Sequence, residues 1–247
     1  MNYTDIISKW KEKKIDSIEK LDQQLSNFRI TFAYNSGTIE NPQITYHATR
    51  EVFENGKVIN FCGDTQTIFE IENQKKCYNF LVPKIINKDP ITSDLIKKIH
   101  YQLMQGVYDE HRWQKGERPG HYKIHDYVIG KSNQGALPKE VPAEIAELCD
   151  EILNIPDKGD NILKTAAYIH CKFENIHAFA DGNGRVGRTL MNYYLIINNY
   201  PPLVVYSETK DQYYKSLDHY DNTGDITPYL NYMKKSLEKT WVLGELK

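Results

Sequence analysis

Two apolar stretches flank a short polar segment, and this arrangement constrains the fold more than any other feature of the chain. Upstream, residues 161–176 carry apolar side chains at the spacing of a buried helix. Downstream, a second apolar stretch continues to Asn198-Asn199 and is followed by Pro201-Pro202, a combination typical of a helix end. The residues in between, 177–188, read HAFADGNGRVGR. We therefore expect two core helices joined by a loop that carries the polar side chains.

The segment between these helices suits a ligand that contains phosphate. His177 is a candidate general base, and Asp181 is a candidate ligand for a hard cation. In the run Gly182-Asn183-Gly184, backbone N–H groups can converge on an anion, because glycine tolerates positive φ and close approach. Arg185 and Arg188 lie one turn apart near the start of the second helix, whose N-terminus also favours anions. The alternative, a tight glycine turn with solvated arginines, does not account for the histidine and the aspartate.

The same residues resemble the signature of Fic-domain enzymes, H-x-F-x-[DE]-G-N-G-R-x-x-R. The fixed positions are met by His177, Phe179, Asp181, Gly182, Asn183, Gly184, Arg185 and Arg188. Many members have proline after the histidine, where this chain has Ala178, but that difference removes no reactive group. The resemblance implies a mainly α fold, a Fic-type helical bundle with a small β-hairpin flap over the active site.

A stretch with little helical periodicity resembles the flap of that family. It runs from Tyr122 to Ile129 and is bordered by Gly120 and Gly130. Lys123 stands where the family commonly has arginine. The resemblance implies that Tyr122, Lys123 and Ile124 dock the backbone of the target protein by strand addition.

A segment near residues 211–225 resembles the part of the family's site that holds the nucleotide base. Asn222 is the best match for an asparagine that the family places against adenine, and Asp221 is the alternative. Tyr213 and Tyr214 are weaker nucleotide candidates, because tyrosines at helical spacing are more often part of a core.

A second motif lies far upstream. Ser36-Gly37-Thr38-Ile39-Glu40-Asn41 resembles the family's inhibitory pattern, [ST]-x-x-x-E-[GN]. Taken alone, this pattern is more typical of a capped helical turn with a solvated glutamate. Together with the signature, it implies that Glu40 pairs with Arg188 and prevents ATP from binding productively.

The resemblance implies protein adenylylation, in which AMP passes from ATP to a Ser, Thr or Tyr hydroxyl of a target protein. In this reading His177 is the general base, and Asp181 holds Mg²⁺, with Mn²⁺ as an alternative. Gly182, Asn183 and Gly184 would hold the phosphates together with the two arginines. The alternatives are transfer of phosphate, UMP or phosphocholine, removal of AMP with water positioned by Glu40, and a catalytically silent nucleotide-binding interaction module.

Composition excludes some classes of partner. The formal net charge of -2 gives no general electrostatic footprint for nucleic acid or an anionic membrane. No apolar run has the length of a membrane span, and residues 1–14 lack the apolar core of a signal peptide. The dispersed cysteines, Cys62, Cys77, Cys149 and Cys171, favour reduced thiols. We expect a soluble, cytoplasmic protein whose partner is its target; self-modification and a homo-oligomer are left open.

The rest of the chain predicts further helices. They are expected from 18 to near 35–37, at 46–55 and 65–82, between Thr92 and Gly106, at 142–152 and 210–220, and from Pro228 after an N-cap at Thr227. We divide the chain into an N-terminal helical region, 1–60, and a core, 61–247, which form one compact unit. His170 is interpreted as a core histidine, and His121 and His125 as surface residues.

Overall fold

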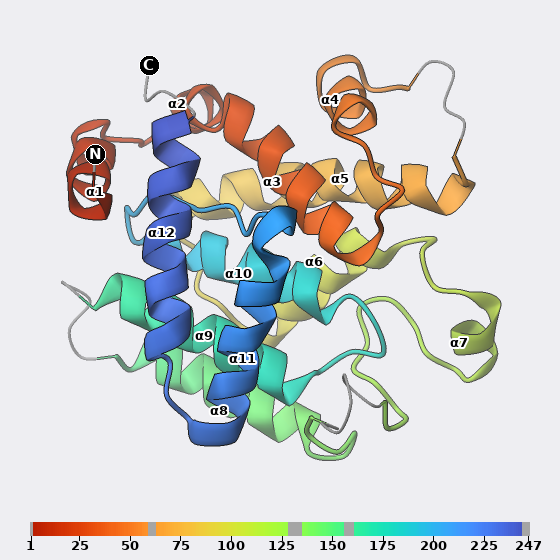
Figure 1. Cartoon of the computed structure of the whole chain (residues 1–247). Coiled ribbons are helices and arrows are strands. Elements are labelled where there is room, and N and C mark those ends of the chain that lie inside the picture. Colours follow the sequence, from red (N-terminus) through yellow and green to blue (C-terminus); the bar gives the residue numbers. More distant parts are fainter. Residues whose placement is uncertain (1, 59–62, 128–134, 156–160, 244–247) are drawn as a thin grey trace.

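Helices are the only regular structure among the residues that this computed structural model describes, which are 2–58, 63–127, 135–155 and 161–243 (Figure 1). They are α1 (Tyr3–Glu12), α2 (Ile18–Gln24), α3 (Ser26–Glu40), α4 (Tyr46–Asn55), α5 (Thr65–Asn87), α6 (Ser93–Met104), α7 (Glu110–Gln114), α8 (Val141–Leu153), α9 (Ile162–Ile176), α10 (Asn183–Ile197), the short 3-10 helix η1 (Ser207–Thr209), α11 (Lys210–Thr223) and α12 (Thr227–Leu243). The mainly α prediction is confirmed. The predicted β-hairpin is not, because residues 121–127 form bends and irregular backbone, while 128 and 129 lie outside the described residues.

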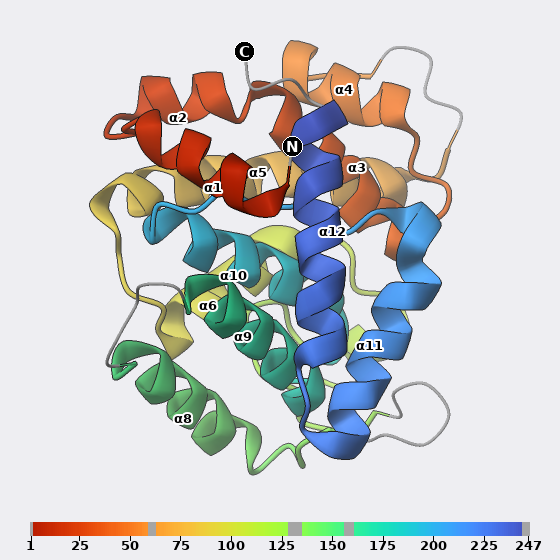
Figure 2. The same cartoon turned by 60° about the vertical axis from the view of Figure 1, so that its left-hand side comes forward.

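The two helices predicted around the polar loop form the centre of the molecule. α9 packs against α10, and α10 in turn contacts α5 and α6 (Figures 1 and 2). α8, α11 and α12 cover the remaining sides of α9, while α3 contacts α4, α5 and α10. Both central helices are buried along most of their length. The loop that joins them is therefore held by rigid elements on both sides.

Most helix limits follow local signals in the sequence. The hydroxyl of Thr92 accepts the N–H of Leu95 at 3.1 Å, as expected of an N-cap. Gly56 adopts a positive φ of 72° directly after α4. α5 runs on past the predicted end at residue 82 and contains Pro83, since its apolar side continues to the buried Ile85.

The N-terminal region differs from prediction. The expected helix from residue 18 breaks at Leu25, and α3 then continues to Glu40 instead of ending near 35–37. Gly37 lies inside α3, where a Cβ would come within 2.7 Å of the Cδ1 of Ile44. Glycine thus lets the last turn of α3 lie against the segment before α4. As a result, residues 36–40 of the second motif share one helical turn.

α1 and α7 were not predicted from the sequence. α1 is attached to the C-terminal helix, because the rings of Trp10 and Trp241 are 5.2 Å apart and the N–H of Tyr3 donates to Glu238. The largest apolar cluster includes Ile6 from the N-terminal region as well as Trp241.

Three of the four cysteines are described by the structure. Cys77, Cys149 and Cys171 are free and buried, while Cys62 lies outside the described residues. Within the described part of the chain, no helix is both long enough and apolar enough to span a membrane.

Candidate active site

The polar loop is a tight connection between α9 and α10. His177 has a positive φ of 52° and ends α9, and Gly182, with φ 80°, precedes α10. The side chain of Asn183 bonds to Phe179 twice, accepting its N–H at 2.9 Å and donating to its carbonyl at 2.7 Å. Asn183 therefore shapes the loop with the side chain that we expected to contact phosphate.

A buried histidine, His100, packs against the loop and bonds to it. The ring of His100 stacks on Phe179 at 3.8 Å, and its Nδ1 accepts the N–H of Gly120 at 2.7 Å. The hydrogen must then lie on Nε2, which donates to the carbonyl of Asp181 at 3.0 Å. Burial lowers the pKa of His100 to about 3, which keeps this neutral tautomer. We did not single out His100 in the sequence; its only signal was a lone histidine on the apolar face of a predicted helix.

His177 has the protonation state required of a base. Burial lowers its pKa to about 4, and the nearby charge of Lys123 acts in the same direction. The imidazole is therefore neutral at pH 7 and can accept a proton.

Two segments lie beside the loop. The N–H of Lys123 donates to the carbonyl of Ala178 at 3.0 Å, and the N–H of Ala136 donates to that of Ile176, also at 3.0 Å. The structure thus places Tyr122, Lys123 and Ile124, the predicted docking residues, directly next to the loop. Lys123 is buried and Ile124 is 57% exposed.

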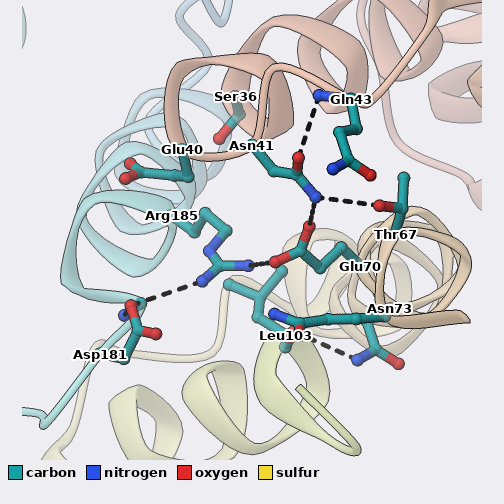
Figure 3. A network of polar contacts seen from close by, with 12 residues as sticks. Ser36, Glu40, Asn41, Gln43, Thr67, Glu70, Asn73, Leu103, Asp181 and Arg185 are labelled. Carbon is teal, nitrogen blue, oxygen red and sulfur yellow. Dashed lines mark hydrogen bonds and ion pairs between the residues drawn. The ribbon is translucent and has the colours of Figure 1, made fainter. Parts of the chain in front are cut away.

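Arg185 is held between two carboxylates (Figure 3). Its guanidinium lies 3.6 Å from Asp181 and donates to Glu70 at 3.2 Å. The other oxygen of Glu70 accepts the side chain of Asn41 at 2.7 Å. Glu70 is buried, and sequence reasoning missed it. Asn41, the last residue of the second motif, is thereby connected to Arg185.

Arg188 is fully buried and bonds to two residues of the second motif, Ser36 and Glu40. Its Nη2 donates to Glu40 at 2.7 Å and to the carbonyl of Ser36 at 3.0 Å, and its Nε donates to the hydroxyl of Ser36 at 3.0 Å. Tyr213 accepts from Nη1 at 3.4 Å. The structure therefore brings together Glu40 and Arg188, which are 148 positions apart in sequence.

The carboxylate of Glu40 occupies the start of α10. A Cβ on Gly184 would come within 2.6 Å of its Oε1. Burial by itself would raise the pKa of Glu40, but the charge and the hydrogen bond of Arg188 outweigh it and keep that pKa below its ordinary value. An ionised carboxylate thus lies at a helix N-terminus and against an arginine, where phosphate would also bind.

The nucleotide-base candidates have different environments. Tyr213 is buried, and Tyr214 is 45% exposed, with its ring 5.1 Å from that of Tyr213. Asn222 is exposed and donates to Asp218 within its own helix. Asp221, the alternative, accepts from Asn175 on α9 at 2.8 Å, two residues before His177.

The other histidines lie where they were expected. His170 is buried, and its Nε2 is 2.9 Å from the hydroxyl of Tyr213. His121 and His125 are exposed, and His125 bonds to the buried carboxylate of Glu117.

Asp181 fits the expected cation. Among the residues described, no group of three or more His, Cys, Asp and Glu side chains is arranged to hold a metal by itself. The Asp181 side chain is 36% exposed, and its Oδ1 accepts the N–H of Gly182. One accessible carboxylate together with substrate phosphates is a common way to bind Mg²⁺.

Known proteins resemble this chain over most of its length. The protein adenylyltransferase fic-1 of Caenorhabditis briggsae is 27% identical over 209 residues, which are 84% of this chain and 39% of the relative. The protein adenylyltransferase Fic of Drosophila mojavensis is 28% identical over 226 residues, 86% of this chain and 41% of the relative. The chain thus spans about two fifths of the length of these curated relatives.

Solved structures share the fold. A Fic-domain-containing signalling protein from Bacteroides thetaiotaomicron superposes with a TM-score of 0.83 at 26% identity, covering 98% of this chain and 95% of the other. A fragment of Fic-1 from Caenorhabditis elegans gives a TM-score of 0.79 at 22% identity, covering 96% of this chain and 68% of the fragment. The Fic/DOC family model matches residues 90–195, which include α9, the polar loop and most of α10. Residues 90–195 of this chain, with the signature loop assembled on two central helices, thus match the Fic/DOC family.

Proposed function

We propose that this chain is a protein adenylyltransferase that moves AMP from ATP to a Ser, Thr or Tyr hydroxyl of a target protein, and that Glu40 restrains it. The observation that carries the proposal is that Glu40, at the end of α3, bonds to Arg188 on α10 at 2.7 Å, next to the loop that presents the neutral His177. The names of the relatives, protein adenylyltransferases, support the reaction type.

The reaction follows from the chemistry of the loop. His177 accepts the proton of the target hydroxyl, whose oxygen attacks the α-phosphorus of ATP. The bond between that phosphorus and the oxygen bridging to the β-phosphate breaks, and pyrophosphate leaves. Arg185, Arg188 and the N-terminus of α10 offset the negative charge on the departing phosphates. Asp181 would hold Mg²⁺, with Mn²⁺ as the alternative, and the bound cation supplies further charge neutralisation.

Inhibition follows from competition for Arg188. A guanidinium bonded to Glu40 is not available to the γ-phosphate, and the carboxylate at Gly184 repels phosphate from the helix N-terminus. Ser36 holds the same arginine through its hydroxyl and its carbonyl. Relief of inhibition therefore requires Glu40 to move away from Arg188, while Arg188 keeps its bonds to Ser36.

The test compares labelling by ATP with a tagged α-phosphate in the wild type and in Glu40→Gly. We expect labelling to rise about tenfold or more, since about 1.4 kcal/mol of released restraint already corresponds to tenfold. Glu12→Gly is the matched control, because Glu12 also ends a helix and is exposed. Adding His177→Ala, Asp181→Ala or Arg188→Ala to Glu40→Gly should abolish the gain. Equal labelling of wild type and Glu40→Gly would refute the inhibitory role.

A second candidate function is removal of AMP from a modified protein. Its basis is that 33% of the Glu40 side chain remains accessible although the residue pairs with Arg188, so the carboxylate can also position water. The test incubates an adenylylated protein with the wild type and with Glu40→Gly. Loss of AMP only with the wild type would establish this function.

The remaining alternatives differ in the mass that they add. Incubation with ATP or UTP, followed by mass spectrometry, distinguishes AMP, phosphate and UMP, and phosphocholine requires its own donor. An unchanged mass in every case, with nucleotide still bound, would identify a silent binding module.

The proposal also includes a target with an exposed hydroxyl, self-modification and a cytoplasmic location.

A further inference from the structure

Arg112 reaches the candidate active site from outside the signature. It lies on α7, the short helix between α6 and residues 122–127, which contain the predicted docking residues and are called the docking segment below. Its Nη2 is 3.7 Å from Oδ2 of Asp181. Its Nη1 forms an ion pair with Asp109, the N-cap of that helix. The buried Nε has no hydrogen-bond partner among the residues that the structure describes. The guanidinium is thus anchored at one end and faces Asp181 with the other.

Asp181 is consequently flanked by two positive charges. Arg185 lies 3.6 Å from Oδ1, which also accepts the N–H of Gly182 at 2.6 Å, whereas Arg112 approaches Oδ2. The backbone N–H of Gly182 leaves Oδ2 as the oxygen better placed for a cation. A divalent cation there would be repelled by a guanidinium within about 4 Å. Arg112 and the cation therefore compete for one carboxylate oxygen.

We propose that Arg112 is a further residue of the nucleotide site, with two successive partners. It neutralises Asp181 while no divalent cation is bound, and it turns to the polyphosphate once Asp181 holds the cation. This inference rests on the proposed function, because that function places a cation and a triphosphate at Asp181. The planar guanidinium suits both partners, since it bonds carboxylate and phosphate with the same geometry.

The second partner follows from charge balance. A triphosphate with one divalent cation remains negatively charged, so it attracts the guanidinium that the cation displaces. The side chain of Asp109 is 48% exposed. Its ion pair with Arg112 would keep that arginine at the edge of the site both with and without the cation. Arg112 should therefore weaken the binding of a free cation and strengthen the binding of the nucleotide complex.

The experiment measures two affinities in Arg112→Gln, with Glu40→Gly as the parent so that the inhibitory carboxylate does not interfere. Mn²⁺ binding without nucleotide is followed by electron paramagnetic resonance, and ATP binding with Mg²⁺ by calorimetry. We expect Mn²⁺ to bind about fivefold more tightly and Mg²⁺–ATP about fivefold more weakly. This is the factor for about 1 kcal/mol between two unit charges 4 Å apart in water. Lys115→Gln, an equal loss of charge at the end of α7, should change neither affinity.

The outcomes are distinct. Opposite shifts of the two affinities support the proposal, and Arg112→Lys, which retains the charge, should show smaller shifts. Unchanged affinities, or shifts in the same direction, would overturn it while leaving the adenylyltransferase proposal intact. If ATP binds the parent equally with and without Mg²⁺, and Asp181→Ala has no effect, the proposed function and the inference both fail.

Discussion

Individual side chains in this protein are kept neutral by burial. His100 and His170 have pKa values lowered to about 3, and His177 to about 4. In each case removal of the imidazole from water is the largest cause, because it penalises the charged form. Only His177 lies at the reactive loop, whereas His100 supports it and His170 supports Tyr213. The same physical effect thus keeps neutral both the candidate base and the two histidines that support other residues.

This burial predicts acid sensitivity. An unfolded histidine titrates near 6.5 and the folded His170 near 3, so the unfolded state binds more protons between these values. The stability that the neutral imidazole contributes is complete above about pH 6.5 and is lost as the pH falls toward 3. His170→Gln should reduce this loss by about 1.4 kcal/mol per pH unit between about pH 6 and 4.

The measurement is urea unfolding of wild type and His170→Gln at pH 7, 6, 5 and 4.5. Burial raises the pKa of Glu174 to about 8, so its titration lowers stability as the pH rises between about 4.5 and 8. Because wild type and His170→Gln both contain Glu174, this contribution does not distinguish them. His47→Gln, at an exposed position, serves as the control and should keep the wild-type slope. Identical slopes for wild type and His170→Gln would contradict the prediction.

At the scale of elements, the docking segment is organised by one buried carboxylate instead of by a strand partner. Glu117 is 1% exposed and accepts the N–H of Ile124 at 3.1 Å and the hydroxyl of Tyr127 at 3.0 Å. His125 also bonds to it. The loss of helical periodicity, the bordering glycines and the resemblance predicted a hairpin, but here backbone groups of the segment bond to Glu117 and to the loop. Sequence spacing did not reveal this, because Glu117 lies in a stretch without periodicity.

We predict that Glu117→Ala releases this segment. The amide of Ile124 should exchange with deuterium about tenfold faster or more, since the lost charged hydrogen bond is worth about 1.5–3 kcal/mol. ATP affinity should stay the same, because Glu117 is not part of the phosphate-binding loop. Hydrogen exchange with mass spectrometry checks the first point and calorimetry the second. Glu110→Ala, which removes an exposed contact with Gln114, is the control, and equal exchange in both variants would disprove the role of Glu117.

At the scale of the whole molecule, the N-terminal helix α1 packs against the C-terminal helix α12. Trp241 on α12 packs edge-on against Trp10, stacks with Phe28 on α3 at 6.0 Å and donates to the carbonyl of Pro202 at 2.7 Å. α12 lies alongside α1 in both orientations (Figures 1 and 2). One end of α3 is therefore fixed by aromatic packing, and the other carries Glu40.

We predict that Trp241→Ala lowers the free energy of unfolding by about 3–5 kcal/mol, the usual cost of truncating a buried aromatic residue. It should also raise α-phosphate labelling, because α3 is less firmly held. Calorimetry should show a single transition at a lower temperature. Tyr46→Ala, at an exposed aromatic position, should change little. Two separate transitions in the wild type would instead indicate that residues 1–60 unfold as an independent domain.

The sequence by itself determined the features that depend on neighbouring residues. The polar motif 177–188, the helices around it, the N-cap at Thr92 and the end of α4 at Gly56 follow from spacing and local hydrogen bonding within a few positions. The resemblance added Glu40 as the expected partner of Arg188. These signals are short-range, so they could be recognised without knowing how the helices pack.

Only the tertiary structure decided which distant groups complete the site. His100, Glu70, Arg112 and Glu117 come from segments outside the signature, and each was assigned a role only once helix packing placed its polar atoms beside the loop or the docking segment. The approach of Ile44 to Gly37, inside the last turns of α3, was likewise visible only in the folded chain. Such contacts depend on the burial of one helix face against another, and that burial is a property of the whole fold that local spacing does not specify.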